Sequence, residues 1–270
     1  MYETKHTCTE EEDSLFEKEK GYISTMVWSD VFSCPYCHEE LVFYNDAVNK
    51  DTKKVNKTFN CSSCNSKLTK NNCNRVFIES HSSVLGKKVK ELKQVPVLIE
   101  YTYKRKKFIK SLDDDDRKLL EKIESTEIPY WFPINELPNG YNLKQPRISH
   151  GITNVHQFYT KRNLWILSAI RDKCKNDKNL LIWFTSQLIN VSKLNRYRPE
   201  VSFPYNPLSG TLYIGSQVAE SNVIIAYKNK MKNILKAFAN VQENNIVSVQ
   251  SVTNLQMNDN KIDYIFTDPP

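Results

Sequence analysis

The sequence contains no long hydrophobic segment. Its longest uninterrupted apolar run extends from Leu180 to Phe184, whereas a membrane-spanning helix needs ~20 largely apolar residues. The first residues, MYETKHTCTEEED, also lack the apolar core of a secretion signal. Both absences argue against a membrane protein and against secretion, so we expect a cytoplasmic protein in a reducing environment.

Glycine is scarce as well. The chain has only six glycines, at positions 21, 86, 140, 151, 210 and 215, and no two of them are separated by a single residue. Loops that hold a dinucleotide or a nucleotide phosphate use closely spaced glycines, because glycine lets the backbone approach the ligand. The sequence therefore encodes neither a Rossmann-type loop nor a P-loop.

The rest of the composition is that of a globular protein. Of the 270 residues, 40% are hydrophobic and 26% are charged, which excludes disordered, collagen-like and low-complexity classes. This length allows one large domain or two smaller ones, at ~100–200 residues per domain. The formal net charge of +7 permits an anionic partner without requiring one.

Two Cys-x-x-Cys pairs stand out among the seven cysteines. Two intervening residues let a tight turn direct both sulfurs of a pair at one ion, and a second pair completes a tetrahedral site. Cys34 and Cys37 in the first pair, with Cys61 and Cys64 in the second, therefore predict a zinc ribbon. Four protein ligands leave no open coordination position, so we expect the zinc to be structural.

The segment between the two pairs is slightly longer than in most ribbons, which is consistent with a hairpin. Residues 40–44 and 55–59 are predicted as its strands. Disulfides, buried thiols or a redox pair are alternatives that a reducing cytoplasm and two pairs in one small module disfavour. Cys73, His38 and His81 are possible substitute ligands, although the regular spacing favours the four paired cysteines.

Downstream of the ribbon, residues 95–103 are β-rich. The basic run at residues 104–107 is interpreted as a turn or strand end, with phosphate contact as the alternative. Four consecutive acidic residues, 113–116, are interpreted as the cap and first turn of a helix rather than as a metal site. Residues 128–140 are aromatic and proline-rich and are predicted to be extended, as a boundary.

The carboxyl-terminal half alternates between helix and strand patterns. Helices are predicted from Thr160 through Ile170 and at residues 179–191 and 222–239, with strands at 211–214, 246–249 and 262–267. This order favours a mixed or parallel sheet covered by helices, in which ligands bind at the carboxyl ends of the strands. The last predicted strand is followed directly by Asp268, Pro269 and Pro270.

Several segments together resemble a known family. They are Val27–Cys37 (VWSDVFSCPYC), Ser149–Leu164 (SHGITNVHQFYTKRNL), Asn190–Tyr197 (NVSKLNRY) and Asp263–Pro270 (DYIFTDPP). On these segments the chain resembles the amino-methylating bacterial DNA methyltransferases, specifically the adenine-specific group that carries a zinc ribbon. Residues 149–164 are the most specific part, because the Asp-Pro-Pro ending is shared by all amino-methyltransferases.

The resemblance implies transfer of a methyl group from S-adenosylmethionine to the exocyclic N6 amine of adenine in DNA. The base has to be flipped out of the duplex, because its amine is otherwise engaged in pairing. Catalysis is carried over to Asp268, Pro269 and Pro270, with the Asp268 carboxylate and the Pro269 carbonyl accepting hydrogen bonds from the amine.

The fold implied by the resemblance is α/β. Residues 146–270 would form a partial class I methyltransferase-like sheet with helices, joined by a connector at residues 81–145 to a small β zinc ribbon at residues 22–80. Family members also carry a glycine-rich loop for S-adenosylmethionine upstream of the ribbon and an aromatic residue after Asp-Pro-Pro, and this sequence contains neither. We therefore expect a split or truncated enzyme, inactive alone and completed by a second chain that carries the cofactor loop.

Basic residues in the carboxyl-terminal half are candidate contacts for DNA phosphates, which would position the protein without reading sequence. They are Lys161, Arg162, Lys193, Arg196 and Arg198. His150 and His156 either line the site or are hydrogen-bonded structural histidines. The alternative function is a non-catalytic zinc-ribbon module that binds nucleic acid, and a third interpretation directs the same machinery to RNA.

Overall fold

The computed structural model describes residues 1–6, 19–201, 205–239, 249, 251, 263, 264 and 266. The catalytic candidates Asp268, Pro269 and Pro270 lie outside these residues. The strands predicted at 246–249 and 262–267 fall almost entirely outside them too.

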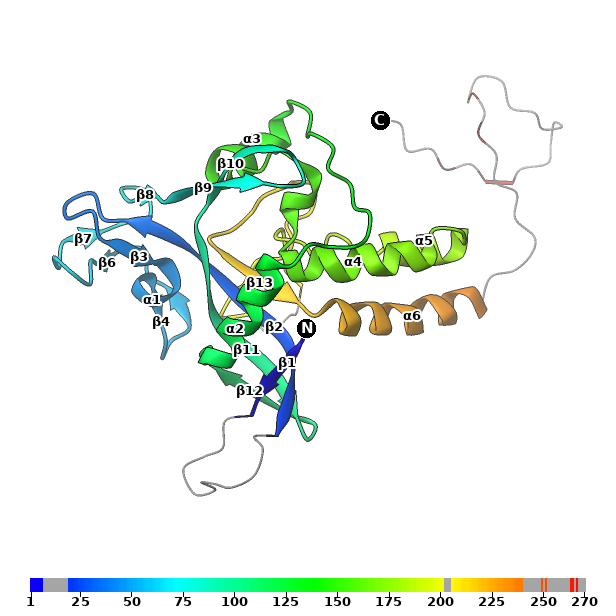
Figure 1. Cartoon of the computed structure of the whole chain (residues 1–270), viewed down its shortest axis with the longest axis horizontal. Helices are drawn as coiled ribbons and strands as arrows, with labels where there is room; N and C mark the ends of the chain where they lie inside the picture. The colour runs from blue at the N-terminus through cyan, green and yellow to red at the C-terminus, as the bar shows by residue number, and fades with distance from the viewer. Residues whose placement is uncertain are drawn as a thin grey trace.

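The described residues combine a large antiparallel sheet with helices and short hairpins (Figure 1). The strands are β1 (Glu3–Lys5), β2 (Lys20–Ser33), β3 (Glu40–Val42), β4 (Val48–Asn49), β5 (Lys54–Val55), β6 (Phe59–Asn60), β7 (Lys67–Leu68), β8 (Asn74–Arg75), β9 (Phe77–Ser82), β10 (Lys87–Leu92), β11 (Gln94–Tyr103), β12 (Lys106–Lys110) and β13 (Gln217–Ser221). The helices are α1 (Phe43–Ala47), α2 (Asp114–Ser125), α3 (Tyr141–His150), the 3-10 helix η1 (Val155–Phe158), α4 (Lys161–Cys174), α5 (Lys178–Thr185) and α6 (Val223–Ala239).

The long strand β2 organises the main sheet, which has seven strands. Along most of its length β2 pairs with β11 on one edge and with β1 and then β13 on the other. Its last residues, from Val31 to Ser33, pair instead with β3 and β8 of the cysteine-containing module. One strand therefore belongs to both parts of the molecule, as Figure 1 shows.

Every strand pair of this sheet is antiparallel. For the described residues, the prediction of a mixed or parallel sheet is therefore wrong. The strand predicted at residues 211–214 is also absent there, and the chain pairs with β2 a few residues later, as β13. The sequence of β13, Gln-Val-Ala-Glu-Ser, is too polar to look like a buried strand, yet all five of its residues are buried. Its polar side chains are accommodated by partners from distant segments, which no local pattern reveals.

Local signals at helix ends are confirmed. The Asp113 carboxylate accepts a hydrogen bond from the Asp116 amide, the Asp116 carboxylate accepts one from the Asp113 amide, and this capping box begins α2. The hydroxyl of Thr160 accepts from the Asn163 amide at the start of α4. The helix predicted at 179–191 begins as expected in α5 but ends at Thr185.

Two predicted irregular segments are confirmed as well. Residues 128–140 form no helix and contribute only an isolated bridge between Glu136 and Asn154. The basic run follows β11 as a tight turn in which Lys104 and Arg105 both have positive φ, 45° and 67°. Two successive positive φ values are typical of the type I′ hairpin turn, which matches the strand twist.

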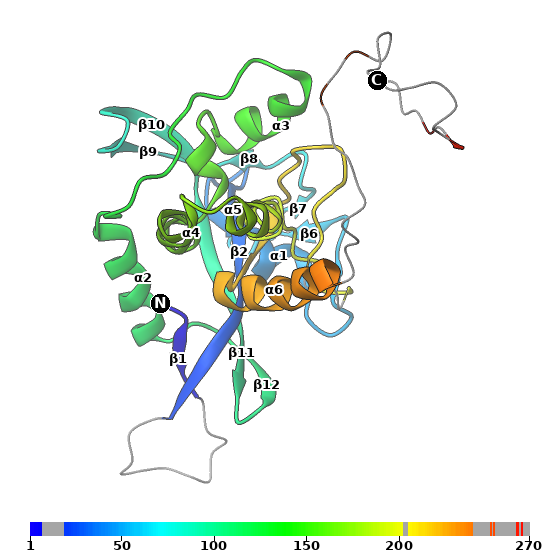
Figure 2. The same cartoon turned by 90° about the vertical axis from the view of Figure 1, so that its right-hand side faces the viewer.

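The hydrophobic core is divided among several clusters around the sheet. At one end of the molecule, α4, α5 and α6 pack against one another (Figures 1 and 2), with Leu167, Phe184 and Tyr227 buried between them. At the other end, a separate cluster of Phe32, Leu68 and neighbouring side chains surrounds the cysteines. Within the described residues, no helix has the length and apolar character needed to cross a membrane.

Candidate metal centre and nearby surfaces

The two Cys-x-x-Cys pairs are built in the same way. In each, the amide four residues after the first cysteine donates to that cysteine's carbonyl at 3.0 Å, from His38 to Cys34 and from Asn65 to Cys61. His38 and Asn65 have φ values of 63° and 58°, in the left-handed region that histidine and asparagine tolerate better than most residues. Each turn thereby directs its two sulfurs to the same side.

The four thiols converge on one point. The Sγ atoms of Cys34 and Cys64 are 3.8 Å apart, those of Cys37 and Cys61 are 3.7 Å apart, and all four lie within 4.8 Å of one another. A tetrahedron of sulfurs ~2.3 Å from a zinc ion has edges of about 3.8 Å. The cluster therefore has the size and the ligand set to hold a metal ion such as zinc.

The surroundings of the cluster suit a structural site. Cys34 and Cys61 are buried, whereas Cys37 and Cys64 lie nearer the surface. Hydrogen bonds from the Ser66 hydroxyl and amide lower the pKa of Cys64 to about 6, which favours the thiolate that metals bind. Within the described chain, Cys73, His38 and His81 are not members of the cluster, although Cys73 is buried in the same hydrophobic core.

A lysine-rich surface accompanies the metal centre. Its exposed side chains are Lys50, Lys53, Lys54, Lys57 and Lys67. The first three lie on or beside the β4–β5 hairpin, and β6, next to Lys57, contributes Phe59 to the core around the cysteines. Within the described residues, none of these ammonium groups lies within 4.0 Å of a carboxylate. Sequence analysis missed this surface, because the lysines are dispersed rather than consecutive.

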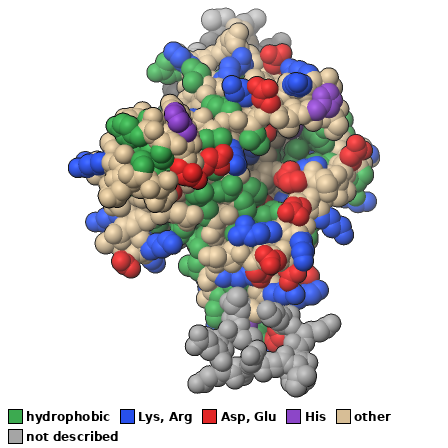
Figure 3. Space-filling view, turned by 60° about the vertical axis from the view of Figure 1, so that its left-hand side comes forward, with side chains coloured by type: hydrophobic (Ala, Val, Ile, Leu, Met, Phe, Trp, Pro, Cys, Tyr) green, Lys and Arg blue, Asp and Glu red, His purple; other side chains and the backbone are tan. Residues whose placement is uncertain are grey.

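A second basic hollow lies between the β9–β10 hairpin and the end of α3, with a volume of about 480 Å³. Lys87, Lys88 and Lys90 line it together with Arg147, whose guanidinium donates to the Leu137 carbonyl at 2.8 Å. Figure 3 shows that basic and acidic side chains are interspersed over the face it displays. Positive charge on that face is therefore local rather than a single continuous surface.

The residues predicted to contact phosphate are mostly engaged within the protein. Lys161 donates to the Glu124 carbonyl, Arg196 donates to the Asn206 carbonyl at 2.9 Å, and Arg198 pairs with Glu200 at 3.1 Å. Lys193 is half-buried. The structure does not gather these residues into one exposed surface.

Arg162 is a correction to the sequence prediction. Its side chain is only 2% exposed, and its Nε atom lies 3.0 Å from an equally buried Glu220 oxygen. The guanidinium also donates to the Met1 carbonyl, and Trp28 donates to the second oxygen of Glu220. Because the charge is already paired inside the protein, Arg162 does not reach a phosphate.

His150 is a buried residue in a polar cluster rather than an exposed ligand. Its Nδ1 atom lies 2.7 Å from the Ser149 hydroxyl, and its Nε2 atom lies 3.5 Å from a carboxylate oxygen of the fully buried Asp30. Gln94 donates to the same oxygen at 2.8 Å. The cluster ties the end of α3 to β2 and β11, which is a structural role.

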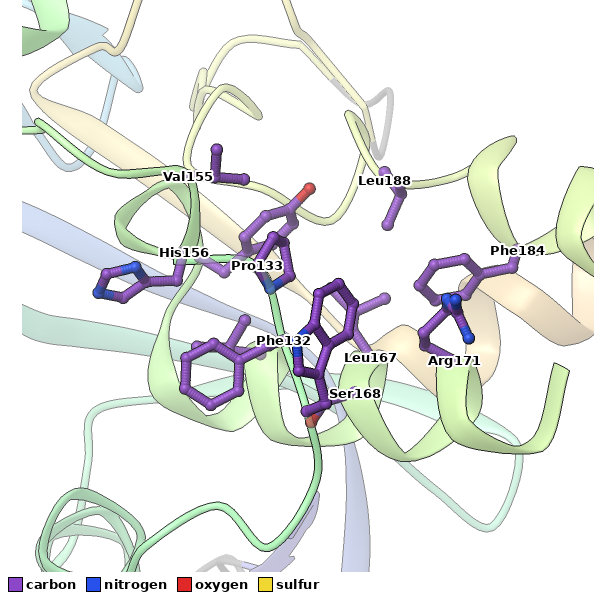
Figure 4. A pocket seen from close by; sticks show the side chains of 12 residues that line it. Phe132, Pro133, Val155, His156, Leu167, Ser168, Arg171, Phe184 and Leu188 are labelled. Carbon is purple, nitrogen blue, oxygen red and sulfur yellow. The ribbon is translucent and has the colours of Figure 1, made fainter. Parts of the chain in front are cut away.

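His156 instead lines a cavity between the segment 131–133 and the helices α4 and α5 (Figure 4). Burial lowers the pKa of this histidine, so the ring stays neutral at physiological pH. The cavity walls come largely from residues 155–171, and therefore overlap the segment that carries the most specific resemblance.

Comparisons of the chain with protein-family models, with curated proteins and with solved structures give no match. The geometry itself establishes a mixed α/β chain with a large antiparallel sheet and a four-cysteine cluster that could hold a metal ion. Function is therefore argued from the chemistry of these sites.

Proposed function

We propose that the chain binds DNA through a zinc-bearing ribbon, as part of an adenine-specific DNA methyltransferase. The observation that carries this proposal is the convergence of four cysteine thiols in the same small module as the exposed lysines. A fully coordinated zinc has no open position for chemistry, so it would fix the shape of the module. The lysines would then meet DNA phosphates, which is the sequence-independent part of DNA affinity.

Methyl transfer rests on the resemblance of residues 27–37, 149–164, 190–197 and 263–270 to amino-methyltransferases. In this proposal Asp268 and the Pro269 carbonyl hold the adenine amine, with Pro270 completing the motif, and S-adenosylmethionine is the methyl donor. No pair of glycines is separated by a single residue in the sequence. A second chain is therefore the proposed source of the cofactor loop.

The metal assignment is tested by comparing two cysteine variants. Cys64→Ser removes a cluster thiol from a position near the surface, whereas Cys73→Ser changes a neighbouring cysteine outside the cluster. Elemental analysis of purified protein is expected to give one zinc per chain for the unchanged protein and for Cys73→Ser, and a clear loss for Cys64→Ser. Equal zinc content in both variants would contradict the four-cysteine site.

DNA binding is tested by its salt dependence. Lys53→Gln combined with Lys54→Gln removes two charges from the β4–β5 hairpin. For each DNA phosphate that the variant no longer neutralises, the slope of log K against log salt should become shallower by about one. The matched control is Lys118→Gln with Lys122→Gln on α2, which removes the same charge elsewhere. Equal slopes for the two double variants, measured by fluorescence anisotropy on duplex DNA, would remove the hairpin from the interface.

The catalytic part is separated from a non-catalytic module by a transfer assay. The chain would be tagged at its amino terminus, purified from its source cells with any associated chains, and incubated with DNA and methyl-labelled S-adenosylmethionine. We expect label on adenine N6, and its loss in Asp268→Ala with zinc content unchanged. Absence of transfer by the purified assembly would favour the non-catalytic zinc-ribbon module, and label on RNA alone would favour an RNA substrate.

A further inference from the structure

The cavity between residues 131–133 and the helices α4 and α5 is a formed pocket with aromatic walls. Its volume is about 170 Å³. Figure 4 shows the rings of Phe132 and Phe184 on opposite sides of the lining side chains, with Leu167 between them and Arg171 beside Phe184. For comparison, a dry apolar cavity of about 150 Å³ binds benzene. The space therefore admits one planar ring rather than an extended ligand.

The few polar groups at this cavity lie where a planar heterocycle could use them. Tyr159 lines it, and its hydroxyl forms no hydrogen bond within the described part of the chain. Burial raises the pKa of Tyr159 to about 12, so the hydroxyl remains available as a donor. The Nδ1 atom of His156 is buried and likewise lacks a hydrogen-bond partner among the described residues.

The entrance combines an exposed aromatic ring with a cation. Trp131 is 69% exposed, and the Arg171 guanidinium lies over its ring, 5.8 Å from the centroid. Aromatic platforms beside basic side chains are the usual means by which proteins hold unpaired bases and the phosphates that join them. An isolated apolar side chain from a protein partner would make no use of this cation.

We propose that this pocket binds a single unstacked nucleobase of the bound nucleic acid. The inference rests on the proposed nucleic-acid function and extends it from phosphate contact to base contact. The edge of the base enters between Phe132 and Phe184, where it meets the Tyr159 hydroxyl, while Trp131 and Arg171 contact the strand at the entrance. The pocket lies on the side of the sheet formed by α4 and α5, apart from the cysteine centre.

The test is a double-mutant cycle between protein and ligand. The probes are a dye-labelled oligodeoxyadenylate and an abasic phosphodiester strand of the same length, and the variants are Trp131→Ala and the control Tyr141→Ala, whose ring is 92% exposed and outside the pocket. Fluorescence anisotropy is expected to show that Trp131→Ala weakens the oligodeoxyadenylate about fivefold or more and leaves the abasic strand unchanged. Tyr141→Ala should change neither.

Filling the pocket is a second test that keeps all its aromatic rings. Leu188→Phe adds volume from the wall opposite the entrance segment, and it should weaken the oligodeoxyadenylate without affecting the abasic strand. Circular dichroism melting checks that each variant is folded.

The outcomes distinguish the two proposals. If the hairpin lysine variant weakens both strands while Trp131→Ala and Leu188→Phe weaken neither, nucleic-acid binding stands and the base pocket is overturned. Equal weakening of both strands by Trp131→Ala also overturns it, because a base contact cannot act on a strand without bases. If neither strand binds the unchanged protein, the proposed function fails and the pocket proposal fails with it.

Discussion

At the residue scale, Gly151 shows how one side chain too many would disturb two elements. It ends α3 in the left-handed region with a φ of 72°, the usual role of a glycine after a helix. A Cβ atom here would lie 2.0 Å from the carbonyl oxygen of Lys90 in β10. The residue therefore joins the helix end to the β9–β10 hairpin by a backbone contact that only glycine allows.

Gly151→Ala is accordingly expected to lower the free energy of unfolding by about 2–4 kcal/mol, because the clash adds to the backbone strain. The matched control is Gly86→Ala, which has a similar φ of 62° but no atom within 4 Å of the added Cβ. That change should cost only about 1 kcal/mol, for the left-handed backbone alone. Urea denaturation measures both, and equal losses would show that the close approach to Lys90 is relaxed easily.

The buried pair of Arg162 and Glu220 makes a second prediction at this scale. Removing one member leaves the other charge uncompensated, so Arg162→Met and Glu220→Gln should each cost about 3–5 kcal/mol. The double variant removes both charges and should lose less than the sum of the single changes. If the losses simply add in denaturant unfolding, the two side chains do not stabilise each other.

At the element scale, α2 is held by charge as well as by its cap. Lys110 is buried and lies 2.6 Å from Asp113 and 2.8 Å from Asp116. Burial opposes ionisation of Asp113, but the hydrogen bond and charge of Lys110, with the Asp116 amide, hold the pKa of Asp113 below its ordinary value. The ionised carboxylate of Asp113 therefore stabilises the folded state.

Asp113→Ala should reduce the free energy of unfolding by about 1 kcal/mol or more near neutral pH, since both the cap and the ion pair are lost. Because the folded-state pKa is depressed, this contribution is present above the ordinary value of ~3.9 and is lost as pH falls through the lower folded value. The difference between variant and unchanged protein should thus shrink with acidification below about pH 4. Asp114→Ala, exposed in the same turn, is the control, and urea unfolding across a pH series is the measurement.

Elements with local causes were predictable from the sequence, and elements with distant causes were not. The cap of α2, the start of α4 and the span of α6 follow from side chains within a few residues, and the four cysteines from their spacing. β13 could not be predicted, because its buried Glu220 is stabilised by partners about 60 and 190 residues away in sequence. The apolar pocket was missed for the same reason, since its walls come from segments that only the fold brings together.

At the scale of the whole molecule, metal binding and sheet formation share a strand. Cys34 directly follows β2, and residues 31–33 of β2 pair with β3 and β8, whereas residues 25–29 pair with β13. Metal binding supplies folding free energy where a small core cannot. Stability should therefore vary along this one strand according to the partner of each residue.

Removing the metal with a chelator is expected to lower hydrogen-exchange protection at residues 31–33 and to leave residues 25–29 protected. The measurement is amide exchange by mass spectrometry with and without chelator, and Cys64→Ser should reproduce the chelated pattern. Loss of protection over all of β2 would instead show that the ribbon and the sheet unfold as one cooperative unit.

The shared strand also limits how this protein can be shortened or recombined. Excising residues 34–76 and closing the gap would remove β3 and β8 together, leaving the end of β2 with bare backbone donors and acceptors on both sides. Such an edge is a template for pairing with another molecule. A shortened version should therefore self-associate rather than behave as a smaller monomer, and grafting the ribbon onto another scaffold would require taking part of β2 with it.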